Sequence, residues 1–520
     1  MPNHHPSWPG KRQKLRALLL LVGLLVWAGG YELYQCLLGV PEAHARIEEH
    51  FKYGSVGSDN LRRGLPYWIW KVLPDMFPDS LPQNGRTGYK ALGLNVEPGQ
   101  DRPIGFSKRR VLGMDIVGVN CAFCHVSTIR RTADARPAII LGMPGNTVNL
   151  EEFFKFLFKT AGDARFTPDN VMEQILKVNP DMGFIERMKY RLIIIRLYRY
   201  EIGKLKEKFS FLYREGRTEF GPGRVETWVA YKVLKLQEPF GLLDLLPFPD
   251  FGKGHILDPG DVTGLADFPA IWPEKIPGMQ LHWDGNNPVL QERNIIASIG
   301  AGVTPASLDM PGMKRMMQWI VQLSPPRYAD WVPQGIPALA ENPALRVRGK
   351  GLYKNECAYC HDVGGGRVRM VEPIGTLGTD RSRLDSFTEE LKDKLNTVGK
   401  GYPWALRHFV KTDGYANLLL DGIWLRAPYL HNGSVPTLRD LLDEPAKRPQ
   451  KFCRGNDEYD WDKVGFKSHL VGEGCGNFFL YDTRKKDGTS LKGNSNAGHE
   501  YGTNLPANDK NALIEYLKTL

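Results

Sequence analysis

The sequence has little sustained alternation of apolar and polar residues, and no repeat of fixed period runs through its 520 residues. The first shortage argues against an all-β protein, and the second excludes a solenoid. Hydrophobic residues make up 42% and charged residues 24% of the chain, so a mostly disordered protein is excluded as well. We therefore predict a mainly α-helical protein of two or three domains with little sheet. The 55 glycines and 37 prolines indicate long loops.

Features of a nucleic-acid-binding protein are also missing, although the net charge is +10. A basic concentration from Arg187 to Arg217 is interleaved with apolar residues, which is typical of an amphipathic helix. Its basic face could contact anionic lipid or an acidic redox partner. The other interpretation is a solvated face that covers the core. The apolar residues are Ile193, Ile194, Leu197, Ile202 and Leu205.

No A-x-A cleavage site follows the apolar run of residues 17–31. Basic residues precede this run, as in an export signal whose positive end stays in the cytoplasm. We therefore predict an uncleaved signal anchor over residues 1–40, with a removed signal peptide as the alternative, and expect the rest of the chain outside the cytoplasm. The basic residues are Lys11, Arg12, Lys14 and Arg16.

Cysteine is scarce, and four of the seven cysteines lie in two copies of the pattern C-x-x-C-H, "CAFCH" and "CAYCH". Neither copy has the second pair of cysteines or histidines that zinc usually needs, and a thioredoxin-like site has no histidine directly after it. Paired thiols can form thioethers to a haem, and the adjacent histidine can bind its iron. We predict two covalently bound haem c groups, one held by Cys121, Cys124 and His125 and one by Cys357, Cys360 and His361.

Three cysteines lie outside these motifs. Cys36 is beside the predicted anchor, and Cys453 and Cys475 are close to the C-terminus. In an oxidising compartment the last two are expected to form a disulfide. Two free thiols are the alternative.

Helix signals surround the second motif. Asn342 and Pro343 can start a helix that leads into it, and an apolar stripe in residues 508–520 predicts a helix at the end of the chain. Two such helices can clamp a haem in a cytochrome c domain. Further helices are expected at residues 149–160 and 313–323. A proline-rich stretch separates the halves, so we predict an anchor at residues 1–40, an N-terminal haem domain at 41–335 and a C-terminal cytochrome c-like haem domain at 336–520.

Two longer segments accompany the motifs. They are "HWDGNNPVLQERN" at residues 282–294 and "LRAPYLHNGSVPTLRDLL" at residues 425–442. With two C-x-x-C-H motifs, the chain from about residue 110 onward resembles the bacterial dihaem cytochrome c peroxidase superfamily. "GNSNAGHEYG" at residues 493–502, together with "GIW" before the second segment, is most similar to the haem-dependent rubber oxygenase branch. A calcium ion between the two domains is a further candidate cofactor.

The resemblance assigns functions to the residues of the first segment. Trp283 is implied as the bridge for electrons between the haems, which is compatible with packing in a domain interface. Arg293 stands where the peroxidases have a glutamine, and Val303 or Thr304 stands where they have a glutamate. This departure weakens the peroxidase interpretation, because a distal group that moves a proton assists cleavage of the O–O bond.

The resemblance also assigns residues to the pocket above the first iron. Ala297 and Ser298 align with part of an apolar distal pocket that suits dioxygen and an apolar substrate. Three interpretations of His282 stay open: a distal base, a weak iron ligand, or a buried histidine with its hydrogen bonds satisfied. At the second haem the resemblance favours His499 as the sixth ligand. His431 is expected to form a hydrogen bond within its turn, and Tyr415 aligns with the ligand-bearing loop of the peroxidases.

These observations predict a membrane-anchored periplasmic oxidoreductase with two c-type haems. Dioxygen or hydrogen peroxide would react at the His125 haem, and the His361 haem would supply electrons through Trp283. The expected partners are a small redox protein as electron donor or acceptor and an apolar unsaturated substrate. The alternatives are a dihaem peroxidase and a non-enzymatic electron carrier.

Overall fold

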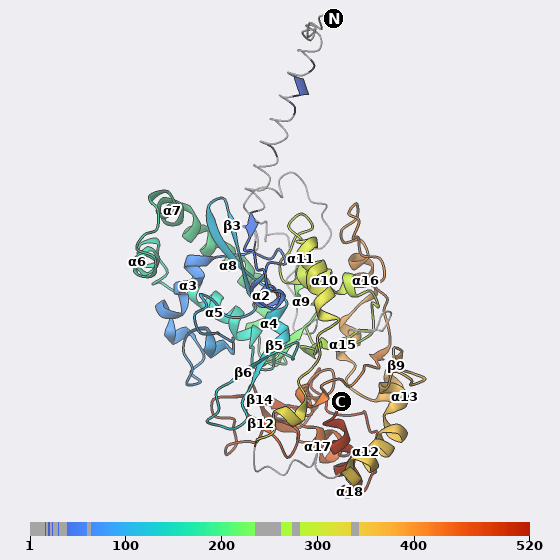
Figure 1. The fold of residues 1–520 in the computed structure, drawn as a ribbon. Coiled ribbons are helices and arrows are strands. Elements are labelled where there is room, and N and C mark those ends of the chain that lie inside the picture. The colour runs from blue at the N-terminus through green and yellow to red at the C-terminus, as the bar shows by residue number, and fades with distance from the viewer. Residues whose placement is uncertain are drawn as a thin grey trace, which may run out of the picture.

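The chain folds into helices and short strands (Figure 1). The computed structural model describes residues 39–59, 64–233, 262–272, 281–333 and 343–520, with a few isolated positions besides. Almost all of the predicted signal anchor at residues 1–40 lies outside these ranges. Within them, no helix has the length and apolarity needed to cross a membrane. The boundary at residue 335 is also outside them, so the division into domains stays a prediction.

The prediction of a mainly helical protein with little sheet is wrong. Helices account for 40% and strands for 13% of the structure, and the strands form one four-stranded and five two-stranded sheets among the described residues. The longest strands have only six residues, so alternation never extends far enough along the sequence to be recognised. The hairpin formed by residues 106–119 turns at Leu112 and Gly113, which both have positive φ, as a two-residue hairpin turn requires.

All of the sheets are antiparallel. The four-stranded sheet has the order β1-β3-β4-β2, and the other strands form pairs. Its strands are β1 (Val40–Pro41), β3 (Phe106–Val111), β4 (Met114–Val119) and β2 (Leu65–Pro66), and the pairs are β5 (Val126–Ile129) with β6 (Ala138–Leu141), β7 (Arg224–Glu226) with β8 (Leu265–Asp267), β9 (Val371–Pro373) with β10 (Gly414–Ala416), β11 (Lys451–Arg454) with β14 (Phe479–Asp482), and β12 (Tyr459–Asp460) with β13 (Gly465–Phe466).

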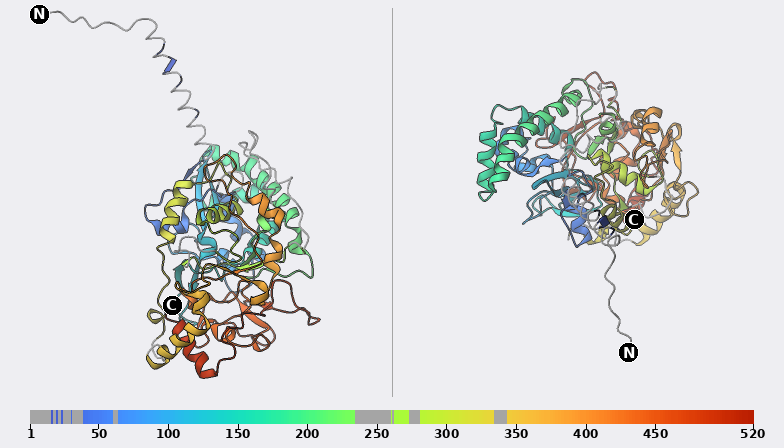
Figure 2. Two further views of the ribbon diagram at one scale, coloured as in Figure 1. Left: turned by 90° about the vertical axis from the view of Figure 1, so that its right-hand side faces the viewer. Right: turned by 90° about the horizontal axis from the view of Figure 1, so that it is seen from above.

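Two further views show the helices among which these sheets lie (Figure 2). Those before residue 335 are α2 (Ile47–Tyr53), α3 (Tyr67–Met76), α4 (Ala122–His125), α5 (Leu150–Gly162), α6 (Pro168–Val178), α7 (Phe184–Lys189), α8 (Ile195–Lys208), α9 (Val229–Val233), α10 (Leu290–Gly300) and α11 (Met310–Ile320). Those after it are α12 (Pro343–Glu356), α13 (Ala358–His361), α14 (Ile374–Leu377), α15 (Ser382–Ser386), α16 (Glu389–Leu395), α17 (Leu438–Leu441) and α18 (Ala507–Leu517).

The four individually predicted helices are confirmed as α5, α11, α12 and α18. At the start of α5 the Asn149 side chain accepts a hydrogen bond from the Glu152 amide, which satisfies one of the unpaired donors of the first turn. Asp309 caps α11 in the same way, through the Gly312 amide. Apolar and polar side chains in the helical pattern therefore located these elements to within a few residues.

Helices α12 and α18 pack directly against each other beside the second motif. Gly349 lies at their closest approach, where an added Cβ would collide with the carbonyl oxygen of Ala512. Leu513, Ile514 and Leu517 of α18 are buried in the same apolar cluster that Cys357 contacts. The expected pair of helices around the second motif is thus present.

The predicted amphipathic helix in the basic stretch is confirmed in part. Helix α7 is followed by a π-helical turn at Tyr190–Ile194 and then by α8. Ile202 is buried, and Ile194 and Leu205 pack against the main core. Ile193 is exposed instead.

Buried hydrogen bonds join segments from the two sides of residue 335. The Thr128 hydroxyl and the Arg130 guanidinium donate to the Asp457 carboxylate at 2.9 and 2.7 Å. Arg224 Nη1 donates to Asn494 Oδ1 at 2.8 Å. The segment after the first motif is therefore held against the C-terminal part of the chain.

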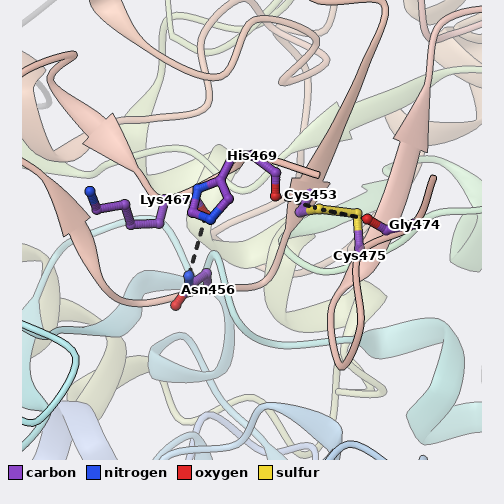
Figure 3. Close-up of a disulfide and its surroundings, with 6 residues drawn as sticks. All are labelled: Cys453, Asn456, Lys467, His469, Gly474 and Cys475. Atoms are coloured by element: carbon purple, nitrogen blue, oxygen red, sulfur yellow. Dashed lines mark hydrogen bonds between the residues drawn. A yellow bond between two sulfur atoms is a disulfide. The ribbon is translucent and has the colours of Figure 1, made fainter. Parts of the chain in front are cut away.

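The predicted disulfide between Cys453 and Cys475 is confirmed (Figure 3). The two Cα atoms are 5.4 Å apart and the residues are 22 positions apart in sequence. Cys453 belongs to β11, and the next residue in this strand is Arg454. The disulfide thus closes a loop directly beside a buried arginine.

Replacement of Cys453 and Cys475 by serine should lower the free energy of unfolding by about 3 kcal/mol, because the unfolded chain gains the entropy of an open loop of this length. Denaturant unfolding of the oxidised protein and of the variant measures the difference. As a control, a reductant should bring the wild-type protein to the value of the variant and leave the variant unchanged. Equal unfolding free energies without reductant would contradict the prediction.

Candidate functional site

The second motif lies at the junction of α12 and α13, which brings Cys357, Cys360 and His361 to one side of a cavity. His361 Nδ1 is 2.7 Å from the carbonyl oxygen of Leu418. This contact makes Nδ1 the donor and leaves Nε2 as the nitrogen that can bind a metal. Burial lowers the pKa of His361, so the imidazole is neutral, as a metal ligand must be.

His499 faces His361 across this cavity. The centroids of the two rings are 6.3 Å apart. Two imidazoles that bind one metal ion from opposite sides, each at roughly 2 Å, leave their ring centres about 6 Å apart. Burial, with smaller contributions from His361 and Arg448, lowers the pKa of His499 to about 4, so this ring is neutral as well.

A buried arginine holds the loop that carries His499. Arg448 Nη1 donates to the carbonyl oxygens of Asn496 and Gly498 at 2.7 and 2.8 Å. The His499 amide donates to Leu377 O at 2.8 Å. These bonds fix the backbone of the loop, and so the position of the His499 ring.

The cavity has a volume of about 430 Å³, which is within the range of ligand pockets. It contains buried polar atoms without a hydrogen-bond partner among the described residues: Arg426 Nε, Thr379 Oγ1 and His499 Nδ1. Burial of such atoms is costly unless a ligand or water satisfies them. A haem attached to Cys357 and Cys360 would bring carboxylates and an iron atom into this space, so the residues present fit the group.

His431 does not form the predicted hydrogen bond within its turn. Its Nε2 lies 3.0 Å from the Tyr415 hydroxyl, and the two rings are stacked with centroids 4.0 Å apart. The same hydroxyl is 2.7 Å from Asp380 O. Both candidates for an alternative ligand are therefore engaged with each other, which leaves His499 opposite His361.

The first motif follows β4, with Cys124 and His125 in the short helix α4. His125 Nδ1 is 2.8 Å from Pro269 O, and burial lowers the pKa of His125 to about 4. The geometry repeats that of His361: a backbone carbonyl binds one ring nitrogen of a neutral imidazole. Residues next to Cys121 pack in one apolar cluster with Val303 and Met313, which places the start of α11 against this motif.

Trp283 is bound on both sides by backbone groups. Its indole Nε1 donates to Asp267 O at 2.9 Å, and its own carbonyl accepts from the Ala416 amide at 2.8 Å. Asp267 is two residues from Pro269, which binds His125, and Ala416 is two residues from Leu418, which binds His361. Trp283 also lines the cavity of the second motif. It therefore lies between the two segments that orient the motif histidines.

Asp267 is a residue that the sequence did not single out. Its carboxylate accepts from Arg454 Nη2 at 2.7 Å, and its amide donates to His431 O at 2.9 Å. Burial raises the pKa of Asp267 to about 6, although Arg454 and Arg224 act in the opposite direction. Asp267 thus positions the carbonyl that binds Trp283. No local pattern marks it, whereas Arg426 lies inside the quoted segment 425–442 and could have been found there.

The residues expected near the first haem are only partly brought together. Arg293 donates to His282 O and, at 2.9 Å, to Asn286 Oδ1, so it holds the backbone before Trp283. His282 is buried beside Trp283 in the wall of the cavity. Burial, followed by Arg293, lowers the pKa of His282 well below its usual value.

The small residues of α10 do not line this cavity. Ala297 is exposed, and the Ser298 hydroxyl donates to Asn294 O at 3.0 Å. Asn294 Nδ2, one helical turn earlier, is buried with no hydrogen-bond partner in the described part of the chain. It is a candidate donor to a ligand that the sequence did not indicate.

The predicted calcium ion is not supported by a set of ligands. Within the described residues, no group of three or more His, Cys, Asp or Glu side chains could hold a metal ion. Burial raises the pKa of Glu292, but hydrogen bonds from His408 and Asn287 lower it overall. This carboxylate therefore binds the segment that contains His408. The number of haems likewise stays a prediction.

Comparison with known proteins identifies part of this site. Residues 414–453, which contain Tyr415, Leu418, Arg426 and His431, match the family described as RoxA-like, cytochrome c-like. The chain thus contains a cytochrome c-like domain, and a domain of this kind implies covalently bound haem c. This finding agrees with the cavity beside the second motif.

Two proteins of Sinorhizobium fredii are similar over longer segments. The uncharacterized protein y4iM is 30% identical over 296 residues, which are 49% of this chain and 64% of the relative. The uncharacterized protein y4iJ is 46% identical over 110 residues, which are 19% of this chain and 17% of the relative. Each match therefore covers less than two thirds of the relative's own length.

Replacement of His499 by alanine should change the haem of the second motif from low-spin to high-spin, because one of its two facing imidazoles is lost. His431→Ala is the matched control: it also removes a buried imidazole, and the low-spin spectrum should persist. Absorption and electron paramagnetic resonance spectra of the oxidised proteins distinguish the two. The reverse pattern would assign the ligand to His431.

Proposed function

We propose that the protein is a dihaem c-type cytochrome oxidoreductase in which the His125 haem reacts with dioxygen or peroxide and the His361 haem transfers electrons. The observation that carries the proposal is the position of Trp283, which is hydrogen-bonded to the segments that orient both motif histidines. An aromatic ring between two redox centres shortens the path for an electron.

Haem, when bound, supplies one-electron and dioxygen chemistry. The protein's own residues set the conditions for it. The carbonyls of Pro269 and Leu418 hold His125 and His361 in one tautomer each. Arg454 and Asp267 keep the carbonyl that binds Trp283 in place, and the apolar surroundings of the first motif exclude water.

The arrangement favours dioxygen over peroxide as the oxidant. Arg293 is bonded to the His282 backbone, and Glu292 is bonded to the 407–409 loop, so neither is placed to move a proton above an iron. General acid–base assistance typically contributes a factor of 10² or more, and peroxide cleavage should be slow without it. A peroxidase that uses the His282 imidazole as its base is the alternative.

The substrate and partners follow from the same chemistry. A haem pocket without a proton-transfer group suits an apolar unsaturated substrate. Electrons would come from a small redox protein. The disulfide between Cys453 and Cys475 is typical of an oxidising compartment, which supports a periplasmic location.

Each motif should hold one covalent haem, so acid-acetone extraction of the denatured protein should leave about two irons per chain. After reduction, carbon monoxide should bind to one of the two haems, because His361 and His499 would hold the other from both sides. Binding to neither would identify an electron carrier. Cys121→Ala/Cys124→Ala should remove the reactive haem and retain the other spectrum.

The choice of oxidant can be measured on the same protein. With an apolar unsaturated substrate, oxygen consumption should exceed peroxide turnover, and an oxygen electrode and a peroxide assay measure the two rates. Rapid peroxide turnover that His282→Ala abolishes would instead establish the histidine-assisted peroxidase.

Trp283→Phe should slow electron exchange between the haems roughly tenfold, the effect of about 1.4 kcal/mol on a barrier, because the indole and its hydrogen bond to Asp267 are removed. Stopped-flow reduction, followed at the two haem spectra, measures the rate. Trp404→Phe, in a separate apolar cluster, is the control and should leave the rate unchanged. Equal rates in all three proteins would exclude Trp283 as the bridge.

A further inference from the structure

We infer that residues 184–193 form a docking surface for an anionic lipid bilayer. This segment, named the apolar ridge below, comprises α7 and most of the π-helical turn that follows it. It is remote from the cavity of the second motif in sequence, and the inference does not depend on the haem chemistry.

The apolar ridge exposes several large apolar side chains in succession. Phe184 is 76% and Ile185 71% exposed, and Leu192 and Ile193 are each 53% exposed. Single exposed apolar residues are common on soluble proteins, but a contiguous group of them marks a surface that contacts something apolar.

The helix geometry explains why these residues face outward. A π-helical turn at Tyr190–Ile194 adds to the number of residues per turn and so shifts the helical phase. Tyr190 at the start of this turn and Ile195 directly after it are both buried, which leaves Leu192 and Ile193 on the outer face. A regular helix would direct more of this apolar sequence toward the core.

The charges around the apolar ridge are mainly positive. Residues 184–208 contain eight Lys or Arg and three Glu, and of the eight cations only Lys208 is buried. Arg191 is within the apolar ridge, is more than half exposed and pairs with the exposed Asp169 at 2.7 Å. Apolar side chains bordered by cations are the combination that binds the interface of a bilayer with anionic headgroups.

The apolar ridge also lies at the end of the molecule where the described chain begins. Val40 pairs with Arg110 in the four-stranded sheet, and Lys189 Nζ donates to Leu112 O at the adjacent hairpin turn, at 2.9 Å. Figure 1 shows α7 and β3 at the same end of the fold. The described chain therefore begins beside the apolar ridge, and the apolar run of residues 17–31 precedes it in the sequence.

A bilayer fits these observations better than an acidic protein partner. A soluble acidic partner would be bound by the cations, and it would gain little from four projecting aliphatic and aromatic side chains. A bilayer accommodates both, since the apolar side chains enter the acyl boundary while Lys and Arg remain at the headgroups.

Flotation of the full-length holoprotein with vesicles tests the inference. Binding to vesicles of phosphatidylglycerol and phosphatidylcholine should exceed binding to phosphatidylcholine alone, and high salt should weaken it. Phe184→Glu/Ile185→Glu should reduce flotation about tenfold, since charged residues are costly in the acyl region. Val347→Glu/Val471→Glu is the control with the same change of charge, at residues that are 73% and 68% exposed on other parts of the surface.

Hydrogen exchange with and without vesicles locates the contact. Slower exchange confined to residues 184–193, with none in α12, supports the docking surface. Wild-type flotation of the Phe184→Glu/Ile185→Glu variant, or equal binding to both kinds of vesicle, would overturn it. Self-association that this variant abolishes, without any lipid binding, would assign the ridge to a second copy of the chain and would overturn it as well. Haem spectra and thermal unfolding of both double variants serve as the control for correct folding.

Discussion

The two hydrogen bonds of Trp283 connect the parts of the site. The indole N–H of the partly buried Trp283 needs an acceptor, and Asp267 O supplies it from the segment that also binds His125. The carbonyl of the same tryptophan is bound by Ala416, two residues before the carbonyl that binds His361. Because each motif histidine is oriented by a segment that Trp283 contacts, a shift of this residue would disturb both.

Buried arginines hold the loops that make these contacts. Arg454 is bonded to Asp267 and to Gly433 O, and Arg448 is bonded to the loop that carries His499. Removing one partner of a buried pair leaves an uncompensated charge, which costs several kcal/mol. The long loops of this chain can therefore position ligands as well as helices do. The disulfide at Cys453 restrains the strand that carries Arg454.

Sequence patterns were reliable where the chemistry is local. The C-x-x-C-H motifs and the helix starts at Asn149 and Pro343 depend on residues within a few positions of one another, and the structure has the predicted helices there. The pair Cys453 and Cys475 could be predicted because few other cysteines compete for it. The sheets could not, since strands of two to six residues show too little alternation. His431 was wrongly assigned a bond within its turn, because Tyr415 approaches only in the folded chain.

The sequence by itself therefore determined the attachment chemistry: paired thiols with an adjacent histidine, twice, and a cytochrome c-like segment at residues 414–453. Only the tertiary structure decided which groups surround them. It brought His499 to face His361 across 138 positions of sequence and placed the Asp267 carbonyl where it binds the Trp283 indole. It also left Leu192 and Ile193 exposed. The physical reason is that the paired thiols and the histidine of each motif must be neighbours in sequence, whereas the facing histidine, the hydrogen bonds and the burial depend on distances that only packing sets.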